Sequence, residues 1–94
     1  MATIPLVTSE REEIFGKIIQ DERKAKEISQ EKLAWLTGLD RTAISLIENG
    51  KRSPTFSTIL KICSAIDIDP SELFSIYEKK DPDYHTGKRR KPGK

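Results

Sequence analysis

The strongest constraint on the fold is residues 29–50, SQEKLAWLTGLDRTAISLIENG, which carry two short helical patterns on either side of one glycine. Each pattern opens at a residue that favours a helix N-cap, Ser29 in the first and Asp40 in the second. Apolar residues recur at helical spacing in both, and these are Leu33, Ala34 and Leu36, then Ala43, Ile44 and Ile47. Gly38 can take the positive φ that ends a helix, and Leu39 after it is predicted to be buried. We therefore expect two helices that meet at a tight turn.

Two helices joined by a turn of three or four residues with a glycine form a helix-turn-helix. The second helix of such a unit lies in the major groove of DNA. The spacing alone indicates DNA binding only weakly, so the side chains must be considered as well.

Length and composition exclude several classes of protein. Ninety-four residues suit one domain with a modest core. No apolar run approaches the roughly 18 residues that span a bilayer, and the N-terminus lacks a charged start, so we expect a soluble, unprocessed chain that binds no membrane. The single cysteine, Cys63, cannot form an internal disulfide, which fits a cytoplasmic protein, and one histidine with one cysteine is too few for a zinc site. No nucleophile–base pair, phosphate loop or carboxylate pair is recognisable, so we expect no enzyme activity, no catalytic residue, no cofactor and no metal.

The net charge of +2 is unevenly distributed. Residues 79–94 hold seven basic and two acidic side chains, a charge of +5, whereas residues 1–78 hold ten basic and thirteen acidic ones, a charge of −3. The folded part therefore cannot attract DNA by bulk charge. Attraction must come from a local group of cations, Arg41, Lys51 and Arg52, and a contribution from the tail stays open.

Three further helices are predicted around residues 29–50. Ser9 and Glu12 form a capping box, so the first helix should cover residues 10–26. Its predicted inward face consists of Ile14, Phe15, Ile18, Ile19, Glu22 and Ala25.

The other two helices follow Pro54. Thr55 caps one of them, and the helical spacing of its apolar residues makes Cys63 most simply a core residue; that face is Ile59, Ile62, Cys63 and Ile66. Asp69 caps the last helix, Pro70 occupies its first position, and it should end near residue 78. The chain thus divides into an extended arm at residues 1–8, a helical domain at residues 9–78 and a basic tail at residues 79–94, predicted to be disordered.

Several stretches of the sequence carry a resemblance to a known family. The segment SQEKLA, the turn at Gly38, the pair Ile44 and Ser45, and IENGKRSP at residues 47–54 together look like the phage repressor and Cro (XRE) family of helix-turn-helix regulators. The resemblance covers residues 14–74, and the run at residues 40–45 is most similar to the controller proteins of restriction-modification systems. It implies an all-α fold, a compact five-helix bundle of the lambda-repressor-like DNA-binding type.

The resemblance also implies a structural ion pair between Arg23 and Glu48, which would tie the first helix to the end of the third. Two solvated surface charges are the alternative interpretation. If the pair is buried, removal of one partner would cost roughly 3–5 kcal/mol of stability.

The candidate base-reading residues lie at the start of the predicted recognition helix, and they are Asp40, Arg41, Thr42, Ser45 and Leu46. The Arg41 guanidinium can donate to guanine O6 and N7 together, a contact worth roughly 1–3 kcal/mol of discrimination. Thr42 offers a hydroxyl group and a methyl group, and Ser45 lies one turn further along the helix. Leu46 stands where relatives often have a polar side chain, which leaves contact with a thymine methyl group as its role.

The candidate DNA-backbone residues flank that helix, and they are Ser29, Gln30, Asn49, Lys51 and Arg52. Ser29 and Gln30 begin a helix whose N-terminus favours a phosphate, and the resemblance implies the same role for the other three. Taken singly, each has an ordinary alternative, a capping side chain for Gln30 and a solvated loop for Lys51 and Arg52. Trp35 points off the apolar face of its helix, which leaves two placements open, half-buried under the first helix or towards the DNA backbone, and we favour partial burial.

The last helix carries more apolar surface than a short helix can bury on one side. Its candidate dimer-interface residues are Leu73, Phe74, Ile76 and Tyr77. One helix-turn-helix reads only about four or five base pairs, too few for specificity in a genome, so we expect a homodimer on a palindrome. In relatives, this helix forms the dimer contact.

The leading hypothesis is a sequence-specific, homodimeric transcriptional regulator that binds double-stranded DNA. It would repress by covering a promoter or activate by touching RNA polymerase. The alternative is an antitoxin that binds a toxin protein and autoregulates its operon, for which only residues 1–8 and 79–94 are available as a partner-binding segment.

Overall fold

The computed structural model of the protein describes residues 10–84, which form five helices and no strand. The predicted all-α architecture is confirmed. In chain order the helices are α1 (Glu10–Ala25), α2 (Gln30–Thr37), α3 (Arg41–Glu48), α4 (Phe56–Ala65) and α5 (Pro70–Lys80). None of the helices in this described range is both long enough and apolar enough to cross a membrane.

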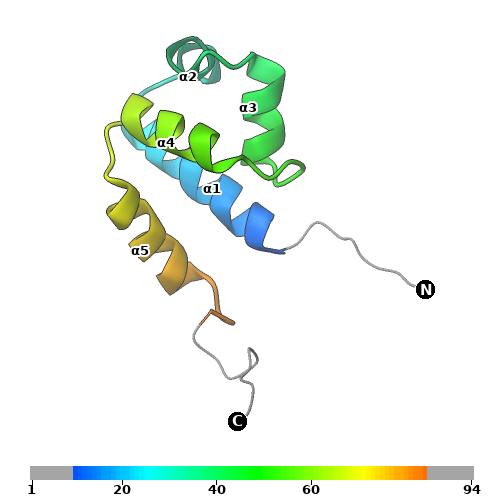
Figure 1. The fold of residues 1–94 in the computed structure, drawn as a ribbon, viewed down its shortest axis with the longest axis vertical. Coiled ribbons are helices and arrows are strands. Elements are labelled where there is room, and N and C mark those ends of the chain that lie inside the picture. The colour runs from blue at the N-terminus through cyan, green and yellow to red at the C-terminus, as the bar shows by residue number, and fades with distance from the viewer. Residues whose placement is uncertain (1–9, 85–94) are drawn as a thin grey trace, which may run out of the picture.

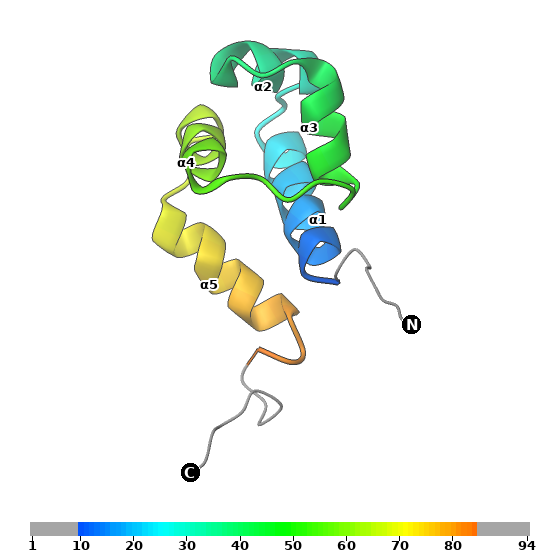
Figure 2. The ribbon, with the colours of Figure 1, turned by 45° about the vertical axis from the view of Figure 1, so that its right-hand side comes forward.

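The helices are arranged around one core. α2 and α3 lie together at one end of the molecule and α5 lies at the other, with α1 and α4 between them (Figures 1 and 2). α1 packs against both α3 and α5, and α4 packs against both α2 and α5. The fully buried large side chains come from every helix and from the linker before α5, and they include Ile18, Ile19, Leu33, Ile44, Ile62, Ile66 and Leu73. Cys63 is among them, as predicted, and burial raises the pKa of its thiol.

Side-chain caps fix where three of the helices begin. The Ser29 hydroxyl accepts from the Lys32 backbone N–H, the Asp40 carboxylate from that of Ala43, and the Thr55 hydroxyl from that of Thr58. Because each cap satisfies a backbone N–H that has no partner within the helix, the predicted starts of α2, α3 and α4 are confirmed. At α5 the proline is in its predicted place, but the Asp69 side chain makes no capping hydrogen bond.

Three expectations about burial were wrong. Leu36 is exposed, and Thr37 takes the buried position on α2 instead, where its hydroxyl donates to the Leu33 carbonyl oxygen at 2.8 Å. That hydrogen bond satisfies the polar atom and so allows threonine inside the core. Ala25 is exposed at the last position of α1. Trp35 is 77% exposed, because α1 does not reach the outer side of α2.

The close packing of α1 on α3 depends on Gly16, to which sequence reasoning gave no role. A Cβ atom at this position would lie 2.3 Å from the Ile47 carbonyl oxygen and 2.6 Å from that of Glu48. These are backbone atoms that cannot rotate away, so any larger residue would separate the two helices. Gly16 therefore determines how close α1 comes to the end of α3.

The end of the domain differs from the prediction. α5 continues to Lys80, and residues 81–84 form a turn in which the Tyr77 hydroxyl donates to Asp81 at 2.6 Å. The described structure therefore includes six residues, 79–84, of the segment that was predicted to be disordered, and within it Tyr84 packs edge-on against Tyr77. The predicted arm at residues 1–8, the capping residue Ser9 and the run of basic residues at 88–91 lie outside the described residues.

Candidate nucleic-acid interface

The turn between α2 and α3 sets the direction of α3. Gly38 has φ +76°, and no atom lies within 4 Å of the place where its Cβ would be, so the backbone conformation alone requires glycine here. Leu39 then packs against the core as a partly buried residue. Asp40 follows and caps α3. The two helices therefore form the predicted helix-turn-helix, with the turn held by its capping residues and by Leu39.

α3 has one buried and one exposed side. Ala43, Ile44 and Ile47 face the core, as predicted. Arg41 and Thr42 are exposed, and Ser45 and Leu46 are partly exposed. The first two turns of α3 thus present Arg41, Thr42, Ser45 and Leu46 on the side away from the core.

The predicted pairing of Arg23 with Glu48 is present and buried. Arg23 Nε lies 2.6 Å from Glu48 Oε2, and Nη2 lies 2.9 Å from Oε1, so the guanidinium and the carboxylate meet through two parallel hydrogen bonds. The Glu48 side chain has no exposed surface. Arg23 Nη1 also donates to the Ile28 carbonyl oxygen at 2.8 Å, which ties the α1–α2 linker to the same group. Geometry of this kind is among the strongest for a protein ion pair.

Gln30 connects this buried pair to the start of α3. Its Nε2 donates to Glu48 Oε1 at 2.9 Å, and its Oε1 accepts from Arg41 Nε at 3.3 Å. Both polar atoms of the amide are therefore used within the protein, a connection that sequence reasoning missed. The remaining donors of Arg41, its two terminal nitrogens, make no hydrogen bond among residues 10–84. The guanidinium is thus bound to Gln30 through Nε, and its two terminal nitrogens are available to a ligand.

Two other candidate base readers already have local partners. Asp40 Oδ1 accepts from the Ala43 backbone N–H at 2.8 Å, so this carboxylate belongs to the cap of α3. The Ser45 hydroxyl accepts from Asn49 Nδ2 at 3.3 Å, one turn along the helix. The Ser45 contact is exposed and can be exchanged for one with a ligand, whereas the Asp40 contact is part-buried and holds the start of α3.

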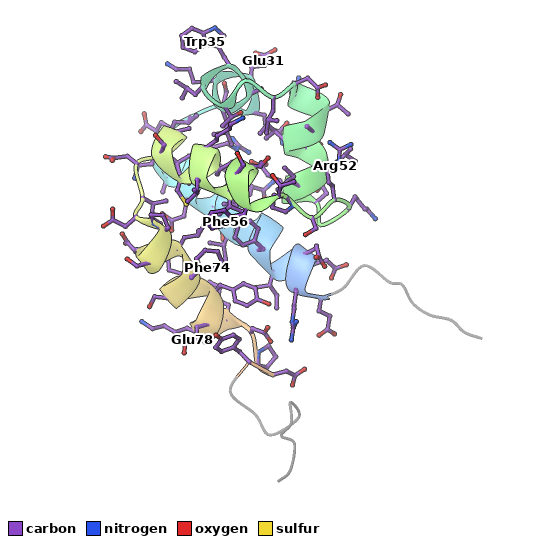
Figure 3. All side chains as sticks on the ribbon, in the orientation of Figure 1. Glu31, Trp35, Arg52, Phe56, Phe74 and Glu78 are labelled. Carbon is purple, nitrogen blue, oxygen red and sulfur yellow. The ribbon has the colours of Figure 1, made fainter. Side chains whose placement is uncertain are left out.

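The candidate backbone residues lie around α3. Ser29 and Gln30 stand at the N-terminus of α2, where Ser29 already serves as the cap. Lys51 and Arg52 are exposed in the bend after α3, and Figure 3 shows Arg52 beside that end of the helix. The structure therefore brings cationic and amide side chains to both ends of the exposed face of α3.

The candidate dimer residues lie away from this face, on α5 at the other end of the molecule (Figures 1 and 2). Leu73 is fully buried in the core and has no surface to offer a partner, so its inclusion in that set is corrected. Phe74 is 44% exposed and stacks on Phe15, with ring centroids 6.2 Å apart. Ile76 and Tyr77 are partly buried.

Comparisons with known proteins agree with this architecture. The family model described as helix-turn-helix matches residues 19–73. Control protein C.MunI from a Mycoplasma species is 46% identical over 66 residues, which cover 69% of this chain and 89% of that protein.

Solved structures give the same result. The crystal structure of the restriction-modification controller protein C.AhdI from Aeromonas hydrophila has a TM-score of 0.68 at 42% identity, and the match covers 70% of this chain and 100% of that one. The controller protein C.Esp1396I bound to a 25 base pair operator site has a TM-score of 0.70 at 30% identity, over 76% of this chain and 93% of that one. The chain therefore belongs to the helix-turn-helix family of DNA-binding regulators and is similar, within it, to restriction-modification control proteins.

Proposed function

We propose that the protein is a sequence-specific transcriptional regulator that binds a palindromic operator as a homodimer, in the cytoplasm, and controls genes of a restriction-modification system. The observation that carries the proposal is the Arg41 guanidinium, oriented by Gln30 and open on its outer edge at the first position of α3. A guanidinium presented in this way suits two hydrogen bonds to the O6 and N7 atoms of one guanine. The similarity to control proteins, one of them solved on its operator, supports the same function.

The base-reading group in this proposal is Arg41, Thr42, Ser45 and Leu46, which share the exposed side of α3. Arg41 reads guanine, and the partly exposed Leu46 contacts the methyl group of a thymine. Asp40 supports them by capping the helix, since one of its carboxylate oxygens is already committed to the backbone.

DNA-backbone contacts position the reading group without selecting sequence. The N-terminus of α2 offers backbone N–H groups and the positive end of a helix dipole to one phosphate, next to Ser29 and Gln30. Asn49, Lys51 and Arg52 contact the phosphates at the other end of α3. Because the domain as a whole is acidic, these local cations provide the attraction.

Homodimerisation supplies the second half-site. A two-fold dimer joined through the exposed part of α5, with Phe74, Ile76 and Tyr77, places two recognition helices about one turn of DNA, roughly 34–36 Å, apart. Repression by covering a promoter and activation by contact with RNA polymerase are both compatible with this geometry. The relatives named above are control proteins, so the antitoxin interpretation receives no support from them.

Selection of binding sites from a random duplex library tests the proposal, with Arg41→Ala and Arg41→Lys measured beside the wild type. The wild type should enrich a palindrome, and both variants should lose the preference for guanine at one position of each half-site. Arg41→Lys keeps the charge and loses the two-pronged geometry, so it separates base reading from phosphate attraction. Lys51→Ala serves as the second control and should weaken binding equally to all sequences. Binding without any enriched sequence, with Arg41→Lys equal to the wild type, would refute the proposal.

A further inference from the structure

Exposed aromatic side chains at the start of α4, on α5 and in the turn after α5 form an apolar face. Phe56 is 72% exposed at the first position of α4, Phe74 is exposed on α5, and Tyr84 is exposed in the turn. Figure 3 shows Phe56 and Phe74 on the same side of the molecule. Phe56 was not among the residues that sequence reasoning selected.

An open cavity of about 350 Å³ lies next to this face. Three helices form its apolar wall, with Phe15 from α1, Ile59 from α4, and Phe74 and Tyr77 from α5. Ser53 lines it on the side of the α3–α4 connection, and Phe56 is not among its lining residues. The molecule therefore has a protruding aromatic side chain beside an apolar cavity, and its own Phe56 does not fill that cavity.

We propose that Phe56 of one copy inserts into this cavity of a second copy, and that two such insertions related by a two-fold axis form the centre of the homodimer. The inference rests on the proposed function, because it identifies the contact that makes the dimer. A two-fold interface places the same surface patch on both subunits, so each patch must contain both the protruding group and the cavity that accepts it. This face contains both.

The exposed area fits a second copy as the occupant. A fully exposed aromatic side chain has an accessible area of roughly 150–250 Å². With Phe56, Phe74 and Tyr84 exposed to 72%, 44% and 42%, their exposed area is therefore about 300 Å² per chain. A standard interface buries about 800 Å² per partner around an apolar centre, so these rings provide a centre of suitable size. Trp35 has a similar exposure but lies on α2, which contributes no residue to the wall of this cavity.

Charge at the rim also suits a second copy. Arg11 and Glu12 line the cavity beside its apolar wall, so the rim carries one cation and one carboxylate. A two-fold axis brings such a rim against an identical one and can place opposite charges face to face, whereas a strongly acidic or basic partner would meet a like charge.

Sedimentation equilibrium without DNA tests the inference on the full chain. Phe56→Ala should raise the dimer dissociation constant at least about 30-fold, because symmetry removes two anchoring rings at once. Trp35→Ala is the matched control, an aromatic residue of similar exposure on α2, and should leave the dissociation constant unchanged. Neither side chain is part of the core, so at concentrations where the protein is a monomer both variants should keep the unfolding transition of the wild type.

A mixing experiment tests the cavity itself. Ser53→Phe places a ring at the cavity from the chain's own loop and should weaken the homodimer as Phe56→Ala does. A heterodimer of the two variants keeps one intact insertion, since the empty cavity of the Phe56→Ala chain can accept Phe56 of the other. The mixture should therefore associate more tightly than either variant alone.

The possible failures are distinguishable. If the wild type dimerises and Phe56→Ala dimerises equally well, the insertion is refuted while the proposed regulator stands. The same conclusion follows if mixing the two variants restores nothing. If the wild type is a monomer at high micromolar concentration, both the insertion and the proposed homodimer are refuted.

Discussion

Replacement of Arg23 by methionine should destabilise the domain by about 3–5 kcal/mol. The change removes two of the three hydrogen bonds that hold the Glu48 carboxylate, which has no exposed surface, and leaves only the one from Gln30. Each hydrogen bond to a charged group contributes about 1.5–3 kcal/mol, and a stranded buried charge costs about 3–5 kcal/mol in total. Since small domains have unfolding free energies of about 5–15 kcal/mol, this loss would be large.

A double-mutant cycle measured by urea unfolding separates the pair from the packing around it. Glu48→Leu should cost a similar amount, because it strands Arg23 instead. The double variant Arg23→Met/Glu48→Leu should lose less than the sum of the two single losses, because an apolar pair leaves no buried charge, although the Ile28 carbonyl oxygen and the Gln30 amide each lose a partner. The matched control is Lys17→Met, which breaks the exposed pair with Asp21 at 2.9 Å and should cost no more than about 0.5 kcal/mol.

Two results would contradict this reasoning. A cost for Arg23→Met as small as that for Lys17→Met would mean that water reaches Glu48 in the folded protein. A double variant whose loss equals the sum of both single losses would mean that the two side chains act through packing and that their charges are not coupled.

Two further predictions concern backbone packing and pH. In urea unfolding, Gly16→Ala should destabilise the domain by about 3 kcal/mol despite the higher helix propensity of alanine, because its Cβ would overlap the carbonyl oxygens of α3. Gly38→Ala should cost about 1 kcal/mol in the same assay, because its Cβ meets no other atom and only the positive φ is unfavourable for alanine. Burial and the hydrogen bond to Asp81 raise the pKa of Tyr77 well above its ordinary value of 10. The folded state therefore keeps this phenol neutral where the unfolded chain ionises it, so the unfolding free energy should fall above about pH 10, by at most 1.4 kcal/mol per pH unit. In Tyr77→Phe the unfolding free energy should fall less steeply above about pH 10. If the unfolding free energy of both proteins has the same pH dependence, Tyr77 is not the cause of the fall.

The parts of the fold that sequence reasoning predicted correctly depend on local interactions. The starts of α2, α3 and α4 follow from Ser29, Asp40 and Thr55, because an N-cap is a contact between a residue and its neighbours three positions on. The turn at Gly38 follows from the φ that only glycine adopts easily. The inward face of α3 follows from periodicity, because its apolar residues are clustered on one side.

The errors arise where burial depends on what lies opposite. Leu36 and Trp35 are both exposed, because none of the helices in residues 10–84 covers the outer side of α2. The apolar pattern of one helix contains no information about which other helices pack against it. Gly16 was overlooked for the same reason, since its importance depends on the backbone of α3, which packs against it from more than thirty residues further along the chain.

The composition of the interface can be understood from the donors and acceptors that must meet at Gln30. A buried carboxylate, which only accepts hydrogen bonds, lies on one side of this residue, and a guanidinium, which only donates them, lies on the other. The glutamine amide can donate to the first and accept from the second, because it carries both an N–H donor and a carbonyl oxygen. Glutamate at position 30 would put its carboxylate next to that of Glu48. Lysine there would put its ammonium group next to the Arg41 guanidinium. The choice of residue at position 30 therefore depends on Arg41 and Glu48, eleven and eighteen positions further along the chain. Through Gln30, the ion pair that joins α1 to α3 is connected to the orientation of the guanidinium that we propose reads the operator.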